Sequence, residues 1–137
     1  MNRTVLIVDD DANACIIAET LLRLRGLSVR SMGDGAEACE LVQRERPAVV
    51  VLALGLPGMN GFEVLRRLRG RYETLRLLMP PRIVVTSERE EAEVERFALR
   101  LGADAFLRKP VGANAFIACV EHCLALPSPD AIGASLS

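Results

Sequence analysis

Residues 48–54 read Ala-Val-Val-Val-Leu-Ala-Leu, the most continuously apolar stretch of the chain. Pro47 precedes this stretch, and the turn-rich segment Gly55-Leu-Pro-Gly-Met-Asn-Gly61 follows it. A short run that is apolar at every position is typical of a strand covered on both faces, because a solvated face would require polar side chains at alternate positions. We therefore predict that residues 48–54 form the central strand of a sheet with helices on both sides.

Shorter strand and helix signals alternate on either side of this strand. Strands are predicted at residues 4–8, 27–31, 83–86 and 105–107, and helices at residues 16–24, 36–46, 62–69, 88–102 and 113–126. This alternation is typical of a parallel sheet joined by right-handed crossovers. The predicted fold class is α/β, with residues 1–126 as one domain and residues 127–137 as a flexible tail or the start of a linker.

Two connections are harder to interpret. Residues 71–81 are predicted to form a long loop that could include one extra helical turn, because Pro80 and Pro81 cannot continue a helix. Ser87 is the predicted N-cap of the fourth helix. The acidic side chains at positions 88, 90 and 91 would suit the positive end of that helix.

Composition narrows the class of protein. The chain has 137 residues, 50% of them hydrophobic, with 17 basic and 18 acidic side chains. This length excludes a two-domain enzyme, and the apolar fraction excludes general disorder. No apolar run approaches the roughly 20 residues needed to span a bilayer, and no secretory leader opens the sequence. We predict a soluble, cytoplasmic protein that does not bind nucleic acid or membrane directly.

The four cysteines, at positions 15, 39, 119 and 123, lack the paired spacing of a zinc ribbon or a disulfide framework. Cys119, His122 and Cys123 would lie near one another on a helix, but a metal site would need a further ligand. We predict that the cysteines are small core residues and that His122 is a surface or half-buried side chain.

Polar side chains follow several of the predicted strands. Asp9 and Asp10 come directly after the first strand, Thr86 ends the fourth, and Lys109 follows the fifth. Because the carboxyl ends of parallel strands meet at one edge of a sheet, these side chains should converge there. Carboxylates suit Mg²⁺, whereas an ammonium and a hydroxyl can hold phosphoryl oxygens. The sequence therefore predicts a site for a divalent cation and a phosphate.

Four motifs carry these residues and their neighbours: Val5-Leu-Ile-Val-Asp-Asp10, Leu56-Pro-Gly-Met-Asn-Gly61, Val84-Val-Thr-Ser87 and Gly102-Ala-Asp-Ala-Phe-Leu-Arg-Lys-Pro110. In this order and spacing they resemble the receiver domain of bacterial two-component response regulators, over about residues 3–126. The resemblance implies a flavodoxin-like (βα)5 three-layer sandwich, with a parallel five-stranded sheet of order 2-1-3-4-5. It also implies transfer of a phosphoryl group from the phosphohistidine of a sensor kinase to an aspartate at the end of the third strand.

The resemblance also assigns roles to residues. Asp9 and Asp10 match the acidic pair that binds Mg²⁺, and the backbone carbonyl of Gly55 would complete the metal shell. Lys109 matches the lysine that contacts the phosphoryl group, with a cis bond expected before Pro110.

Two further residues match the switch of the family. Thr86 corresponds to the hydroxyl that moves toward the phosphoryl group, and Phe106 corresponds to the aromatic side chain that rotates inward. Phe106 could equally be an ordinary core residue. This switch would change the face formed by the fourth helix, the fifth strand and the fifth helix.

One position departs from the family pattern. Ala53 stands where the resemblance places the phosphoacceptor aspartate. A methyl group is no nucleophile, and the Mg²⁺ site also loses a carboxylate, so metal binding should be weakened. Lys109 is then expected to pair with Asp9 or Asp10. Either Ala53 was introduced or recently acquired in a normal receiver, or the chain is a natural pseudo-receiver.

The predicted function is therefore that of a non-enzymatic receiver domain, locked unphosphorylated or independent of phosphorylation, that acts by protein–protein contact. Expected partners are a sensor histidine kinase or phosphotransfer protein, a downstream effector or output domain, and a second copy bound through residues 91–124. The alternative is a small Mg²⁺-dependent phosphotransfer enzyme or phosphatase with Asp9 as nucleophile, against which stands the lack of a cap domain. With one Tyr and no Trp, the sequence gives little support to flavin binding.

Overall fold

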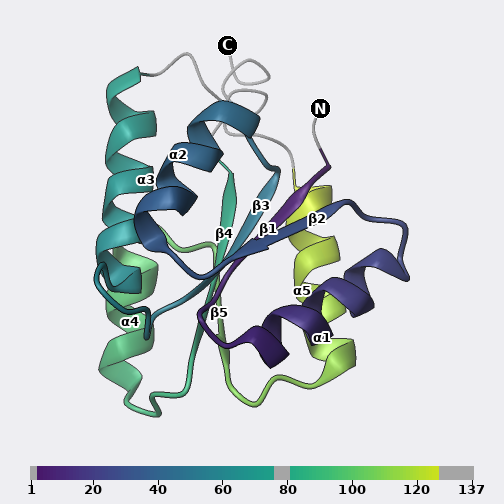
Figure 1. Cartoon of the computed structure of the whole chain (residues 1–137). Helices are drawn as coiled ribbons and strands as arrows, with labels where there is room; N and C mark the ends of the chain where they lie inside the picture. Colours follow the sequence, from purple (N-terminus) through teal and green to yellow (C-terminus); the bar gives the residue numbers. More distant parts are fainter. Residues whose placement is uncertain (1–2, 76–80, 127–137) are drawn as a thin grey trace.

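The computed structural model describes residues 3–75 and 81–126. Its strands are β1 (Val5–Val8), β2 (Val29–Met32), β3 (Val49–Ala53), β4 (Arg82–Ser87) and β5 (Ala105–Arg108). All neighbouring strands are parallel, and their order is β2-β1-β3-β4-β5. The predicted flavodoxin-like fold class and strand order are confirmed (Figure 1).

Helices cover both faces of the sheet, with α1 and α5 on one side and α2, α3 and α4 on the other (Figure 1). Their bounds are α1 (Ala12–Arg23), α2 (Gly35–Glu45), α3 (Gly61–Leu75), α4 (Ala92–Arg100) and α5 (Ala113–Ala125). Each face has its own apolar cluster. In β1, for example, Leu6 and Val8 join the cluster under α2 and α3, whereas Val5 and Ile7 join the cluster under α1 and α5.

Strand β3 lies in the middle of the sheet, as its continuous apolar sequence predicts. All five of its residues are buried, because helices pack on both of its faces and strands pair with both of its edges. This strand carries Ala53 at its carboxyl end, where it fixes the position of that residue in the site.

The structure corrects two sequence interpretations. Helix α3 continues to Leu75, so the extra helical turn is present as the end of α3, and the predicted loop over residues 71–75 is wrong; residues 76–80 lie outside the described part of the chain. No Gly or Pro occurs between positions 71 and 75, so nothing in that segment breaks the helix.

The second correction concerns Ser87. It is the last residue of β4, and α4 begins only at Ala92, with Glu91 at the N-cap position. The Ser87 hydroxyl instead accepts a hydrogen bond from the backbone N–H of Arg89, at 3.0 Å. A serine that closes a local turn after a strand satisfies the same type of donor as an N-cap does, so the sequence alone did not separate the two.

Gly61 begins α3 where this helix passes closest to the end of β3. A Cβ atom at this position would lie 2.5 Å from the Cα of Leu54 and 2.6 Å from the carbonyl oxygen of Ala53. We expect Gly61→Ala to lower the free energy of unfolding by about 1–3 kcal/mol, because backbone atoms would have to move. Urea unfolding followed by circular dichroism measures this change.

Gly70 provides the matched control in the same helix. A Cβ atom there meets nothing within 4 Å. Gly70→Ala should therefore stabilise the protein by about 0.5–1 kcal/mol, through the better helix propensity of alanine. Equal effects of the two substitutions would contradict the close approach of α3 to β3.

Candidate functional site

The carboxyl ends of four strands bring the predicted site residues together. Asp9 follows β1, Ala53 ends β3, Thr86 lies near the end of β4, and Lys109 follows β5. Ala53 and Thr86 are direct neighbours in the register of β3 and β4. The backbone N–H of Lys109 donates to the carbonyl of Ser87 at 2.8 Å, which holds the end of β5 against β4.

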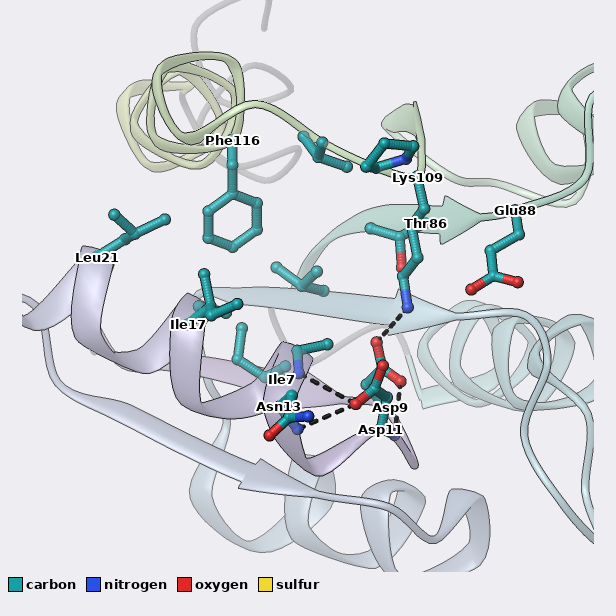
Figure 2. A pocket seen from close by; sticks show the side chains of 15 residues that line it. Ile7, Asp9, Asp11, Asn13, Ile17, Leu21, Thr86, Glu88, Lys109 and Phe116 are labelled. Atoms are coloured by element: carbon teal, nitrogen blue, oxygen red, sulfur yellow. Dashed lines mark hydrogen bonds and ion pairs between the residues drawn. The ribbon is translucent and has the colours of Figure 1, made fainter.

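An ion pair between Lys109 and Asp9 is the central contact of the site (Figure 2). The distance from Nζ of Lys109 to Oδ2 of Asp9 is 2.6 Å, and only 7% of Asp9 is exposed. The other carboxylate oxygen, Oδ1, accepts the backbone N–H of Asp11 at 3.0 Å. Both oxygens of the buried carboxylate are therefore bonded, and the expected pairing of Lys109 is confirmed. The bond before Pro110 is cis, as expected.

The two aspartates that follow Asp9 make no ion pair with Lys109. Asp10 is exposed, and Asp11 caps α1 by accepting the backbone N–H groups of Asn13 and Ala14. This cap holds the start of α1 beside Asp9. Cys15, in the first turns of the helix, donates its thiol to the backbone carbonyl of Asp9. Burial raises the pKa of that thiol, and the Asp9 carboxylate raises it further.

The residues present supply too few available oxygen ligands to hold a resident Mg²⁺ ion tightly. Both oxygens of Asp9 are already bonded, and Ala53 presents a methyl group. Among residues 3–75 and 81–126, no three His, Cys, Asp or Glu side chains converge as a metal site. Asp10 and the carbonyl of the exposed Gly55 are the remaining oxygen donors of the predicted set, and Mg²⁺ requires near-octahedral oxygen coordination.

Thr86 and Phe106 lie on different faces of the sheet. Thr86 is 5% exposed and lines a pocket on the side of α1 and α5. Its hydroxyl makes no hydrogen bond within the described residues. Phe106 is half-buried and packs on the apolar cluster of the opposite face, under α2, α3 and α4.

Comparison with known families identifies the fold. A family model described as "response regulator receiver domain" matches residues 5–121. The chain belongs to this family.

Solved structures of receiver domains agree with this assignment. The signal receiver domain of NarL from Mycobacterium tuberculosis is 30% identical, with 90% of this chain and 96% of that chain covered and a TM-score of 0.78. A response regulator from Chloroflexus aurantiacus is 27% identical, with 92% and 100% covered and a TM-score of 0.81. The BeF3-activated receiver domain of Klebsiella pneumoniae RstA shares the fold at 23% identity, with 90% and 100% covered and a TM-score of 0.81.

Receiver domains are signalling modules that are generally not enzymes. They typically bind Mg²⁺ at an acidic site and interact with histidine kinases or phosphotransfer proteins and with effector domains. In this receiver, no helix within the described ranges is both long and apolar enough to cross a membrane.

A pocket of about 580 Å³ beside the ion pair was not predicted from the sequence. It runs from Thr86 and Lys109 into the space between α1 and α5 (Figure 2). One weak signal for this pocket is present in the sequence. Ile16, Ile17 and Leu24 are apolar residues of the α1 segment that remain exposed, so this helix carries more apolar side chains than the sheet buries.

The thiols of α5 form a second cluster, away from the ion pair. Cys119 is half-buried, Cys123 is buried and His122 is exposed, and all four cysteines of the chain are free. The hydrogen bond from Cys123 lowers the pKa of Cys119 to about 7. The same hydrogen bond, together with burial, raises the pKa of Cys123.

We expect alkylation of Cys119 by iodoacetamide to reach half its maximal rate near pH 7, since the thiolate is the reactive form and is lost as the pH falls through that pKa. Peptide mass spectrometry after timed alkylation at a series of pH values measures this profile. In the Cys123→Ala variant the midpoint should move up toward about 8.5, the value of an ordinary thiol. Identical profiles for the two proteins would contradict the hydrogen bond.

Proposed function

We infer that this receiver domain does not accept a phosphoryl group and signals through protein contacts. The observation that carries the proposal is Ala53 at the carboxyl end of β3, beside Thr86 and on the strand next to β1. This is the position in which the family pattern places the phosphoacceptor aspartate. A methyl group cannot attack phosphorus, so the acyl phosphate cannot form there.

The ion pair supports the same conclusion. Lys109, the one lysine of the sequence, would contact a phosphoryl group in a receiver of the usual type, but here it is bonded to Asp9. The pair neutralises a buried carboxylate without a metal ion. We therefore propose that the site stays in one arrangement, with Mg²⁺ bound only weakly through Asp10 and the Gly55 carbonyl.

The alternative of a phosphatase with Asp9 as nucleophile is less well supported. Both Asp9 oxygens accept hydrogen bonds, one of them from an ammonium group, which lowers the nucleophilicity of the carboxylate. We propose that the domain is not an enzyme.

The proposed partners follow from the family. They are a histidine kinase or phosphotransfer protein and an effector protein or output domain. We propose that these contacts take place in the cytoplasm. A second copy is also proposed to bind through the face of α4, β5 and α5. Leu99 of α4 supports this proposal, since 43% of its surface is exposed.

Intact-mass spectrometry tests the central claim. The protein is incubated with Mg²⁺ and either acetyl phosphate or phosphoramidate, under conditions that phosphorylate an ordinary receiver run in parallel. We expect no gain of a phosphoryl group. A gain that disappears in Asp9→Asn would instead favour chemistry at Asp9, and any phosphoryl adduct on an aspartate would overturn the proposal.

A further inference from the structure

The pocket between α1 and α5 has the composition of a ligand site (Figure 2). We propose that it binds a neutral, mainly apolar small molecule that places one oxygen atom against Thr86 and Lys109. This binding would need no phosphoryl chemistry and no metal ion, and it goes beyond the signalling role proposed above.

The body of the pocket is apolar. Its floor is formed by Ile7 of β1 and Val51 of β3, and its walls by Ile17 and Leu21 of α1 and Phe116 of α5. Figure 2 shows Phe116 reaching from α5 toward the side chains of α1. A volume of about 580 Å³ lies in the range of pockets that enclose small organic molecules, roughly 300–1,000 Å³. An aromatic or branched hydrocarbon would fill this part and displace water from it.

The polar end of the pocket, at Thr86 and Lys109, has hydrogen-bond donors that no residue of the described ranges uses. The Thr86 hydroxyl is buried, with 5% of the residue exposed, and no described residue accepts or donates a hydrogen bond to it. A buried hydroxyl without a partner is costly, so a ligand atom that bonds to it would gain that free energy. The ammonium group of Lys109 has three N–H donors, and the bond to Asp9 uses one of them. An oxygen acceptor fits both groups.

The charge around the pocket disfavours an anionic ligand, and its two donors disfavour an ammonium ligand, which has no lone pair to accept from them. Lys109 is balanced by Asp9, and the rim also carries the exposed carboxylates of Asp11 and Glu88. An anionic ligand would meet a net negative rim at short range, which weakens its binding. A ketone or alcohol oxygen accepts from Lys109 and Thr86 without this repulsion.

Three probes of matched shape test the proposal: 4-phenylbutan-2-one, which is neutral, 4-phenylbutanoate, which is anionic, and 4-phenylbutylammonium, which is cationic. Each is titrated into the ¹⁵N-labelled protein and followed by amide chemical shifts. We expect the ketone to bind saturably with a dissociation constant below about 1 mM, a reasonable affinity for so small a molecule. The butanoate should bind at least about tenfold more weakly because of the negative rim, and so should the butylammonium, which has no acceptor for Lys109 and Thr86. The shifts should centre on Ala18, Val51, Thr86 and Phe116.

Two variants localise the binding. Ala18→Leu places a larger side chain in the pocket and should abolish ketone binding, whereas Ala36→Leu, on the exposed surface of α2, should leave it unchanged. Thr86→Val keeps the shape of the side chain and removes the hydroxyl. It should lower the affinity for the ketone about fivefold, as the loss of one neutral hydrogen bond predicts. Circular dichroism confirms that each variant is folded.

Several results would overturn the proposal: no saturable shift with the ketone, equal binding of all three probes, shifts centred elsewhere, or equal affinity of the Ala18→Leu and Ala36→Leu variants. If only a partner protein, and none of the probes, changed the amide chemical shifts of α1 and α5, the pocket would accept protein side chains instead of a small molecule. No probe carries phosphorus, so failure of the ketone to bind does not bear on the proposal that position 53 cannot be phosphorylated. Likewise, detection of an aspartyl phosphate would not bear on ligand binding in this pocket.

Discussion

The Ala53→Asp variant is expected to bind beryllofluoride in the presence of Mg²⁺, whereas the unchanged chain does not. The substitution adds a carboxylate at the end of β3, next to Thr86 in the sheet register and one strand away from Asp9. It supplies both the nucleophile and the metal ligand that the site lacks. Isothermal titration calorimetry should show Mg²⁺ affinity rising by at least roughly 10- to 100-fold, since the loss of even an outer-shell partner of a metal ligand changes affinity by that much.

Ala53→Asn is the matched control. Asparagine has nearly the same shape as aspartate but no charge, and an amide cannot form an acyl phosphate. It should gain neither beryllofluoride binding nor a phosphoryl group from acetyl phosphate. If Ala53→Asp also failed to bind beryllofluoride while remaining folded, the site would differ from an ordinary receiver site at more than this one position.

The same substitution should weaken the ion pair of Lys109. A second carboxylate close to Asp9 repels it and competes for the ammonium group, so metal-free Ala53→Asp is expected to be less stable than the unchanged chain. Mg²⁺ would relieve this repulsion by binding only the folded state. The present arrangement, in which one lysine neutralises one buried carboxylate, is therefore stable because position 53 carries no carboxylate.

The architecture could be predicted because it depends on repeated local patterns. The apolar run at residues 48–54 fixes β3 as a strand buried on both faces, and alternating strands and helices leave few parallel arrangements. The contact between Lys109 and Asp9 could also be predicted, since both residues follow parallel strands whose carboxyl ends converge.

The pocket and the state of Thr86 could not be predicted in this way. Apolar spacing on α1 and α5 shows which sides face the sheet, but not how much space is left between the two helices. Likewise, the sequence places Thr86 at a strand end but cannot tell whether its hydroxyl finds a partner. Both properties depend on the distances between elements that are remote in sequence, and local patterns contain no record of these distances.

Lys109→Met should be the most destabilising single substitution in the site. It removes the charge that balances Asp9 and leaves a carboxylate with 7% exposure facing the apolar pocket. We expect the free energy of unfolding to fall by about 2–4 kcal/mol, because an unpaired buried charge is costly. Arg25→Met is the comparison: it breaks an exposed pair with Glu121, with 52% and 42% of the two side chains exposed, and should lower the free energy of unfolding far less.

The double variant Asp9→Asn/Lys109→Met separates charge from packing. If the loss in Lys109→Met comes from the unpaired carboxylate, replacing Asp9 by asparagine should recover most of it, since the amide keeps its hydrogen bond from the Asp11 N–H and carries no charge. If Lys109 instead stabilised the fold mainly through the packing of its aliphatic stem, methionine would retain that packing and the single variant would lose little stability. Urea unfolding at one ionic strength distinguishes these results. The four proteins compared are the unchanged chain, Lys109→Met, Arg25→Met and the double variant. A Lys109→Met variant as stable as Arg25→Met would mean that the Asp9 carboxylate does not need Lys109 as a partner, and that the ion pair does not hold the site in its present arrangement.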